Sequence, residues 1–366
     1  MTASVLAVVG ARPNFVKAAP VVEALQGTDG VSVRLLHTGQ HYDRPLSGSF
    51  IEHLGMPQPD ANLGVGSGTH AEQTAGVLIG VEADLMEHPA DLVLVAGDVN
   101  STSAAALAAT KLGVSVGHIE SGLRSRDWSM PEEVNRVVTD HVSQLLLCTS
   151  EDAVANLARE GIAGDGVQLV GNTMIDSLLR ILDDSDRDAV LRAHGVEAQS
   201  FILVTLHRPG VVDDAERLGE VISVLGELGT NLPVLFPAHP RTTARLRDAG
   251  IEIPDRVRII EPIDYADFIA LEANARLVVT DSGGVQEETT VLGVPCLTYR
   301  TTTERPITVE QGTNELVGVD PDVLREAAQR VLVADPPANA PEIPLWDGQS
   351  GPRAAAAIEE YLAQFR

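Results

Sequence analysis

The feature that most constrains the fold is an alternation of short apolar runs with longer helix-forming segments. It is clearest around Arg276–Thr280, a run rich in β-branched residues that predicts a buried strand. The octet 281–288, Asp-Ser-Gly-Gly-Val-Gln-Glu-Glu, follows directly. Residues 286–292 are good helix formers, and Gly293-Val294-Pro295 predicts their stop. The pattern is therefore strand, glycine turn and helix, the unit from which parallel α/β sheets are built.

The glycine pair in this octet indicates a position where a phosphate could be held. Gly283 and Gly284 lack side chains, so their backbone N–H groups can approach a ligand closely. The helix that follows presents partial positive charge at its N-terminus. A glycine pair also occurs in ordinary strand-to-helix turns, so the octet alone is equally consistent with a purely structural turn.

The same alternation runs along the chain and groups the expected strands into two sets. The first set comprises residues 5–9, 31–36, 91–96, 114–119, 145–148 and 167–170. After a helix over 173–182 and a charged linker over 183–188, the second comprises 201–206, 232–236, 257–260, 276–280 and 295–299. Strands alternating with helices predict two doubly wound, Rossmann-like α/β domains with parallel sheets. We expect residues 1–172 to form the first domain and 173–351 the second.

Charge and cysteine content exclude several classes of partner. The 366 residues include 52 acidic and 26 basic side chains, a net charge of −26. Such a surface repels nucleic acid and anionic membranes, so neither is an expected partner. No apolar stretch approaches the ~20 residues that span a bilayer, and Val5–Val9 lacks the basic flank of a signal peptide. Cys148 and Cys296 lie in apolar runs, which predicts buried thiols in a reducing cytoplasm.

Polar residues gather where the predicted strands end. They are Arg12, His37, Asp98, Glu120, His207, His239 and Asp281. Any one of them, taken alone, is well explained as a helix cap or turn residue. Ligands of open parallel sheets bind outside the carboxyl ends of the strands, however, and seven polar residues occur at such ends. We therefore expect one cleft, lined by carboxylates on one side and by a phosphate-holding turn on the other.

The first strand-to-helix turn argues against a dinucleotide cofactor. Residues 10–17 read Gly-Ala-Arg-Pro-Asn-Phe-Val-Lys, which is not G-x-G-x-x-G, and no acidic residue follows at the distance expected for a ribose contact. No His/Cys cluster has metal-ligand spacing either. We expect neither a cofactor nor a catalytic metal.

Eight short motifs occur in order along the chain. They are residues 10–13, 38–41, 97–98, 118–124, 131–136, 207–209, 281–288 and 303–306. Together they resemble the motifs of the non-hydrolysing UDP-N-acetylglucosamine 2-epimerases, and the resemblance extends over residues 4–318. It implies a GT-B-like fold, an active site between two Rossmann-like domains, and a C-terminal helix, 352–366, that crosses back to the first domain. It also implies a UDP-sugar substrate, and we expect a homodimer.

The resemblance further implies roles for single residues. The catalytic group of the family corresponds to Asp98, Glu120, Glu132 and His207, with Arg136 nearby. The positions that hold the ribose and phosphates correspond to Ser282, Gly283, Gly284 and Glu288. The diphosphate and substrate contacts correspond to Arg12, Lys17 and Arg305, and the residue beside the uracil corresponds to Phe268.

Two motifs depart from the family pattern. Members often continue the His207 motif as Arg-Arg-Glu-Asn or Arg-Pro-Ser-Asn, whereas this chain continues as Arg-Pro-Gly-Val over residues 208–211. Bacterial members also have a second, regulatory UDP-sugar site at the positions of Gln40, Arg208 and His239. Asp43 replaces a glutamine expected there, so we do not expect this regulation to be intact.

The implied chemistry, inversion of carbon 2 of a UDP-sugar, is difficult because no adjacent carbonyl acidifies that C–H bond. Oxidation of carbon 3 would need NAD, for which no fingerprint is present. Elimination of UDP across carbons 1 and 2 would leave a 2-acetamidoglucal, to which UDP could re-add. That route needs a base, cations for the diphosphate and a closed site. Asp98, Glu120 and Glu132 are candidate bases, and His207 is a candidate acid.

Three functions remain compatible with the sequence. The first is a UDP-GlcNAc 2-epimerase, including one that acts on a modified UDP-HexNAc. The second is a hydrolysing epimerase that releases ManNAc and UDP. The third is a catalytically silent UDP-sugar-binding protein, since fold does not determine function. Three carboxylates near a diphosphate would bring no advantage to a pure binder, which argues against the third.

Overall fold

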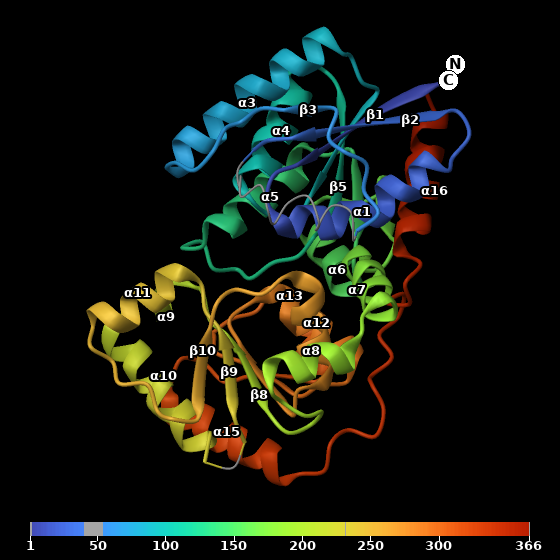
Figure 1. The fold of residues 1–366 in the computed structure, drawn as a ribbon. Helices are drawn as coiled ribbons and strands as arrows, with labels where there is room; N and C mark the ends of the chain where they lie inside the picture. Colours follow the sequence, from blue (N-terminus) through green and yellow to red (C-terminus); the bar gives the residue numbers. More distant parts are fainter. Residues whose placement is uncertain (1, 40–53, 231, 366) are drawn as a thin grey trace. The chain divides into compact units, whose positions relative to one another are not determined.

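The computed structural model describes residues 2–39, 54–230 and 232–365 and divides the chain into two compact units (Figure 1). Unit 1 comprises Met1–Arg180 and Pro344–Arg366, and unit 2 comprises Ile181–Ile343. The motif residues Gln40, His41 and Asp43 lie outside the described residues.

Unit 1 is built on a seven-stranded sheet in which all neighbouring strands are parallel. The strand order is β3-β2-β1-β4-β5-β6-β7. The bounds are β1 Ala3–Val9, β2 Val31–His37, β3 Ala61–Asn62, β4 Leu92–Ala96, β5 Ser115–Ser121, β6 Leu145–Cys148 and β7 Val167–Leu169. Because β1 continues to β2 on one side and the chain returns at β4 on the other, the topological switch point lies between β1 and β4.

The predicted strands of this set are confirmed, but β3 was missed. Its two residues pair with the end of β2, and so short a segment carries no period that a sequence pattern could reveal. The helices of unit 1 are α1 Arg12–Gln26, α3 His70–Glu87, α4 Asn100–Lys111, α5 Pro131–Val142, α6 Glu151–Arg159, α7 Thr173–Asp184 and α16 Ser350–Ala363. The division between the units falls within α7.

Helix α16 packs against α1, although the two are far apart in the sequence (Figure 1). Its first turn fits tightly, because a Cβ on Gly351 would lie 2.6 Å from the carbonyl oxygen of Pro20. The Gly351 N–H donates to Asp176 Oδ2 at 2.7 Å, and Trp346 Nε1 donates to the Thr149 carbonyl at 3.0 Å. Residues 344–366 are therefore an integral part of unit 1.

Unit 2 contains a six-stranded parallel sheet in the order β10-β9-β8-β11-β12-β13. Its strands are β8 Ile202–Thr205, β9 Val234–Pro237, β10 Val257–Ile260, β11 Leu277–Thr280, β12 Cys296–Thr298 and β13 Asn314–Leu316. The switch point of this sheet lies between β8 and β11. The doubly wound architecture predicted for both halves of the chain is thus confirmed.

The helices of unit 2 surround this sheet and pack on it through apolar side chains (Figure 1). They are α8 Arg187–His194, α9 Pro209–Val212, α10 Ala215–Leu228, α11 Pro240–Asp248, α12 Tyr265–Asn274, α13 Gly283–Leu292, α14 Pro306–Glu310 and α15 Pro321–Val333. Tyr299 is fully buried in the core and donates its hydroxyl to the Val319 carbonyl at 2.7 Å.

Two predictions for unit 2 are wrong. The charged linker over 183–188 is mostly helical, because α7 runs to Asp184 and Asp186 caps α8 by accepting the Ala189 N–H at 3.0 Å. The second strand set also has a sixth member, β13, that was not predicted. Its sequence, Asn-Glu-Leu, has no apolar alternation, and its strand geometry depends on pairing with β12.

Cys148 and Cys296 are free and buried, as predicted. Burial raises the pKa of each thiol to about 12, so neither is a thiolate at neutral pH and neither is a nucleophile. Among the described residues, no helix combines the length and the hydropathy that crossing a membrane requires.

Candidate active site

The turn between β1 and α1 is rigid and brings a lysine to the switch point of unit 1. Asn14 Oδ1 accepts the N–H groups of Gly10 at 3.2 Å and Ala11 at 2.9 Å, and its amide donates to the Ala96 carbonyl at 2.7 Å. The turn is thereby tied to the end of β4. Arg12 is exposed on the first turn of α1, whereas Lys17, one turn further on, is buried.

Lys17 and Glu120 form a buried ion pair over the end of β4. Gly97 lies directly beneath the pair: a Cβ there would be 3.0 Å from Lys17 Nζ and 3.3 Å from Glu120 Oε2. Gly97 has φ +66°, so glycine suits this position in both conformation and space. The structure thus brings together Lys17 and Glu120, two residues that the sequence singled out separately.

Asp98 follows Gly97 and is held by Arg136 from helix α5. Arg136 donates from Nε and Nη2 to Asp98 Oδ2 at 3.0 and 2.7 Å. The same guanidinium donates from Nη1 to Glu133 Oε2 at 2.6 Å. The two candidate bases of this edge, Asp98 and Glu120, therefore each have a buried cation beside them.

In the first turn of α5, Glu133 makes the polar contacts, although sequence reasoning did not single it out as a site residue. Its carboxylate accepts the backbone N–H groups of Ser125 at 2.9 Å and Arg126 at 2.8 Å, in addition to Arg136. Glu132, the predicted catalytic residue, is its partly exposed neighbour. The adjacent glutamates differ because one faces the 125–126 loop; a sequence cannot tell which glutamate of a pair faces inward without knowing the rotation of the helix.

Glu120 has an unusual backbone conformation. Its φ is +67°, in the left-handed region that residues with a Cβ rarely adopt. The register between β5 and β6 shifts between Ile119 and Ser121, so Glu120 is the bulged residue of β5. Strained backbone of this kind persists only where surrounding contacts enforce it, and it is common at functional sites.

In unit 2, Asp281 binds the segment that follows β8. Its carboxylate accepts the N–H groups of His207 at 2.9 Å and Arg208 at 2.8 Å, and His207 Nδ1 lies 2.9 Å from Asp281 Oδ1. Burial disfavours the ionised form of Asp281, but His207 and the two N–H groups outweigh it and hold the pKa of Asp281 below its usual value. Asp281 thus fixes His207, whose side chain remains 55% exposed.

The predicted phosphate-holding turn leads into α13, which begins at Gly283. Ser282 is the N-cap residue, and its N–H donates to Thr280 Oγ1 at 2.9 Å. A side chain on Gly283 would overlap the Arg305 guanidinium and would lie 2.5 Å from Glu304 Oε1. Arg305 therefore lies directly against the glycine turn.

Arg305 is part of a buried charge cluster. It pairs with Glu304, and its Nε lies 2.8 Å from Glu287 Oε2, an ion pair without hydrogen-bond alignment. Glu304 also accepts Arg300 Nη2 at 2.7 Å. Glu287 and Glu304 hold the Arg305 guanidinium in place, and Arg300 in turn holds Glu304.

The remaining predicted contacts of unit 2 lie on α12 and α13. Glu288 is buried and accepts the Tyr265 hydroxyl at 2.5 Å. Phe268 is partly buried and packs against the core beneath α12. Burial and the neighbouring charge of Glu288 raise the pKa of Glu272, which is fully buried.

The other two strand-end histidines have structural contacts. His239 caps α11, since its Nδ1 accepts the Arg241 N–H at 3.2 Å. His37 is buried with its ring edge-to-face against Phe15, at a centroid distance of 5.3 Å. No three His, Cys, Asp or Glu side chains within the described parts of the chain are grouped so as to hold a metal ion.

These features define a class of protein. Two α/β units with parallel sheets, each with polar side chains at the carboxyl ends beside its switch point, form a fold of the GT-B-like class. A crystal structure of Methanocaldococcus jannaschii UDP-GlcNAc 2-epimerase, in complex with UDP-GlcNAc and UDP, matches with a TM-score of 0.89 at 40% identity over 99% of both chains. The Neisseria meningitidis UDP-GlcNAc 2-epimerase bound to UDP-GlcNAc matches with a TM-score of 0.86 at 30% identity, over 99% of this chain and all of that one.

Sequence comparison gives the family. The family model described as UDP-N-acetylglucosamine 2-epimerase matches residues 23–359. The M. jannaschii enzyme of that name is 42% identical over 334 residues, 89% of this chain and 91% of the relative. A Pseudomonas aeruginosa UDP-2,3-diacetamido-2,3-dideoxy-D-glucuronate 2-epimerase is 39% identical over 98% of this chain and 99% of its own length. The chain belongs to the UDP-N-acetylglucosamine 2-epimerase family, an enzyme family, and the predicted resemblance and fold class are confirmed.

Proposed function

We propose that this enzyme interconverts UDP-GlcNAc and UDP-ManNAc by eliminating UDP and adding it back. The observation that carries the proposal is the pair of carboxylates at the switch point of unit 1. Asp98 and Glu120 each lie against a buried cation, Arg136 and Lys17 respectively. Crystal structures of two relatives that share this fold contain bound UDP-GlcNAc.

Unit 2 supplies the nucleotide contacts in this proposal. The α13 N-terminus at Ser282, Gly283 and Gly284 and the fixed guanidinium of Arg305 offer N–H donors and positive charge to a diphosphate. Glu288 would accept the ribose hydroxyls, and Phe268 would pack beside the uracil. Arg12 and Lys17 would add positive charge from the first turn of unit 1.

The reaction then proceeds in two balanced steps. A carboxylate takes the proton from carbon 2, the electron pair of that C–H bond forms the double bond between carbons 1 and 2, and the C1–O bond breaks with its electrons leaving on UDP. The enzyme then returns a proton to carbon 2 on the opposite face while UDP oxygen bonds to carbon 1. Asp98, Glu120 and Glu132 are the proposed acid–base groups, and His207, oriented by Asp281, donates to the departing diphosphate.

A second candidate substrate is a modified UDP-HexNAc. The P. aeruginosa relative is similar over nearly its whole length and is named for a diacetamido-glucuronate sugar. Hydrolysis to ManNAc and UDP is the other alternative, in which water intercepts the same glycal. Supplying each UDP-sugar separately and following the products by NMR distinguishes the three.

Isotope labelling tests the elimination route. Product formed in heavy water should carry deuterium at carbon 2, because the abstracted proton passes through an exchangeable enzyme group. Oxygen-18 placed between carbon 1 and the diphosphate should scramble, because freed UDP can rotate before it re-adds. Retention of the label in the bridge would contradict elimination, and free ManNAc as the main product would favour hydrolysis.

A homodimer and a cytoplasmic location are part of the same proposal. They rest on the family resemblance and on the two reduced cysteines, and sedimentation of the purified enzyme tests the first directly.

A further inference from the structure

His118 links the two strands that carry Asp98 and Glu120. It lies in β5 opposite Val95 of β4 and is fully buried. Its Nε2 lies 2.8 Å from the Gly97 carbonyl oxygen, and its Nδ1 lies 2.6 Å from Asp140 Oδ1. The Gly97 N–H in turn donates to the Ile119 carbonyl at 3.0 Å. Both the N–H and the carbonyl of Gly97, the residue before Asp98, are thus hydrogen-bonded to β5.

The hydrogen bonds fix the orientation of the His118 ring. A carbonyl oxygen only accepts, so Nε2 must carry a proton. Asp140 receives donors at both oxygens, since Oδ2 accepts the Gly122 N–H at 3.0 Å and Arg124 Nη1 at 2.7 Å. Burial disfavours the ionised form of Asp140, but His118 and Arg124 outweigh it and hold the pKa of Asp140 below its usual value. Asp140 therefore holds His118, Gly122 and Arg124 around one buried carboxylate.

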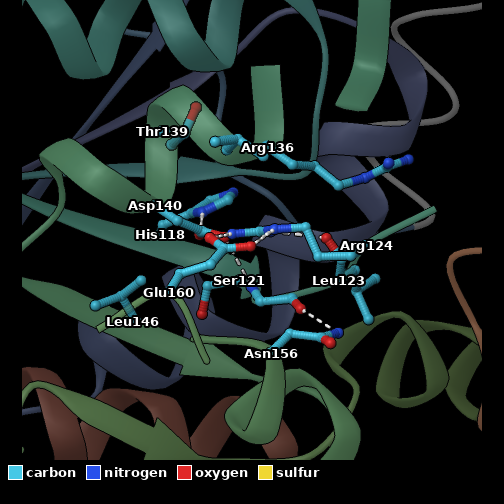
Figure 2. A network of polar contacts seen from close by, with 12 residues as sticks. His118, Ser121, Leu123, Arg124, Arg136, Thr139, Asp140, Leu146, Asn156 and Glu160 are labelled. Atoms are coloured by element: carbon cyan, nitrogen blue, oxygen red, sulfur yellow. Dashed lines mark hydrogen bonds and ion pairs between the residues drawn. The ribbon is translucent and has the colours of Figure 1, made fainter. Parts of the chain in front are cut away.

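Asp140 holds the chain on both sides of Glu120. Oδ1 contacts the His118 ring (Figure 2), and Oδ2 accepts the backbone N–H of Gly122. The Gly122 carbonyl accepts the Asn156 amide at 3.0 Å, so both polar groups of Gly122 are engaged. Between these two anchors lies Glu120, with its left-handed φ and the register shift of β5. The two contacts of Asp140 hold Glu120 in the left-handed conformation, which residues with a Cβ rarely adopt without such support.

Arg124 contacts Asp140 at Oδ2, whereas His118 contacts it at Oδ1 (Figure 2). It donates to Asp140 and makes two parallel bonds to Glu160, from Nε to Oε1 at 2.8 Å and from Nη2 to Oε2 at 2.7 Å. The guanidinium is thus fixed by two carboxylates, and the position of Asp140 is fixed with it.

We propose that the buried His118–Asp140 pair is a positioning device that sets the geometry of both acid–base carboxylates, Asp98 through the Gly97 carbonyl and Glu120 through the bulge that Asp140 holds between residues 118 and 122. Neither His118 nor Asp140 touches the substrate in this assignment. The proposal rests on the proposed epimerase function for its kinetic consequence, but its structural content, the conformation of Gly97 and Glu120, stands apart from the substrate.

Two variants test the device in the full-length enzyme. His118→Gln removes one of the two ring contacts and leaves the Arg124–Asp140 ion pair, and Asp140→Asn keeps the shape but removes the charge. We expect kcat for UDP-GlcNAc epimerisation to fall by roughly 100-fold, because a displacement of about 1 Å costs that much. KM should change by less than about 3-fold, because the nucleotide contacts are in unit 2. Crystal structures of the variants should show Glu120 outside the left-handed region.

The matched control is Asp84→Asn, which removes a half-buried ion pair of the same unit, with Arg34, away from the β4 and β5 ends. It should lose thermal stability but keep kcat. If Asp140→Asn does not fold, His118→Gln carries the test alone. Parental kcat in His118→Gln, or an unchanged Glu120 φ in its structure, would overturn the proposal. An unmodified enzyme without epimerase activity would instead contradict the proposed function, and the Glu120 φ would still decide the positioning role.

Discussion

The two units place charge at the ends of their sheets in different ways. In unit 1 the pairs join residues far apart in the sequence: Lys17 and Glu120 are separated by 103 positions, and Asp98 and Arg136 by 38. Each pair exists only when several strands and helices have been assembled. The acid–base geometry of unit 1 is therefore a property of the whole folded unit, and it includes a left-handed residue that local sequence preference disfavours.

In unit 2 most of the charges around Arg305 are close neighbours in the chain, although Glu287 comes from α13 and the His207–Asp281 pair spans 74 positions. Arg300 and Glu304 are four residues apart, Arg305 follows directly, and all lie in the segment between β12 and α14. The N–H groups at the start of α13 are likewise provided by one turn. In the proposed function, the charges of unit 2 bind the nucleotide and the carboxylates of unit 1 carry out the reaction. We therefore expect substitutions at the unit 1 pairs to change mainly kcat, and substitutions around Arg305 in unit 2 to change mainly the Kd for UDP.

The largest effect should follow from Glu120→Gln in unit 1. The change keeps size and hydrogen bonding but removes the charge, so we expect kcat to fall by about 10²–10⁴-fold. The affinity for UDP, measured by calorimetry, should remain near the parental value. Asp98→Asn and Glu132→Gln complete the series. The control is Glu23→Gln, which removes a half-exposed partner of Arg180 on α1 and should leave kcat unchanged. Turnover at the parental rate in all three site variants would contradict the division of roles.

A smaller loss, in binding instead of turnover, is expected from Arg305→Ala in unit 2. A charge-assisted contact contributes about 1.5–3 kcal/mol, so the Kd for UDP should rise by roughly 10–150-fold. The variant should also melt at a lower temperature, since Glu287 and Glu304 lose a buried cation. Arg330→Ala, which removes an exposed pair with Glu315, is the control and should leave the Kd unaffected. An unchanged Kd in Arg305→Ala would show that the diphosphate binds elsewhere.

The smallest effect concerns stability and pH in unit 2. Neither oxygen of Glu272 receives a donor among the described residues, and burial and the charge of Glu288 raise the pKa of Glu272. The folded state therefore keeps a proton that the unfolded state releases near its usual pKa of about 4.3. This contribution to stability is complete below that pKa and is lost as pH rises toward the folded-state pKa.

Glu272→Gln mimics the protonated form and does not titrate. Calorimetry should find a Tm close to the parental value at pH 5 and a higher Tm at pH 8, with about 2–4 °C for each kcal/mol gained. Glu227→Gln, an exposed glutamate of the same unit, should show no such pH-dependent difference. A difference between variant and parent that stays constant with pH would contradict a raised pKa for Glu272.

Much of this fold follows from sequence pattern, because buried parallel strands are short apolar runs and their ends are marked by glycine and polar residues. The strands over 145–148 and 257–260 have the predicted bounds, and Glu120 was placed correctly at the end of β5. The two missed strands have a common cause. β3 and β13 are two and three residues long and are strands only because a neighbour pairs with them.

Less of the candidate site was predictable. Sequence order identified Asp98 and Glu120, but not that each would have its own cation, because Lys17 and Arg136 come from other elements. Nor could it distinguish Glu133 from Glu132, or show that Asp281 would bind the His207 backbone. Such pairings depend on helix rotation and strand order, which the sequence expresses only through the complete fold.

The packing of α16 on α1 has a consequence for how the polypeptide is made. Residues 344–366 leave the ribosome only after all of unit 2 has been synthesised, yet they belong to unit 1. The face of α1 around Pro20, against which Gly351 fits, remains uncovered during that interval. Unit 2 is continuous in sequence and can fold first, which reverses the usual N-terminal-first order of domain folding during translation. The nascent chain consequently exposes an incomplete apolar surface for the time needed to translate unit 2, the kind of surface that chaperones bind.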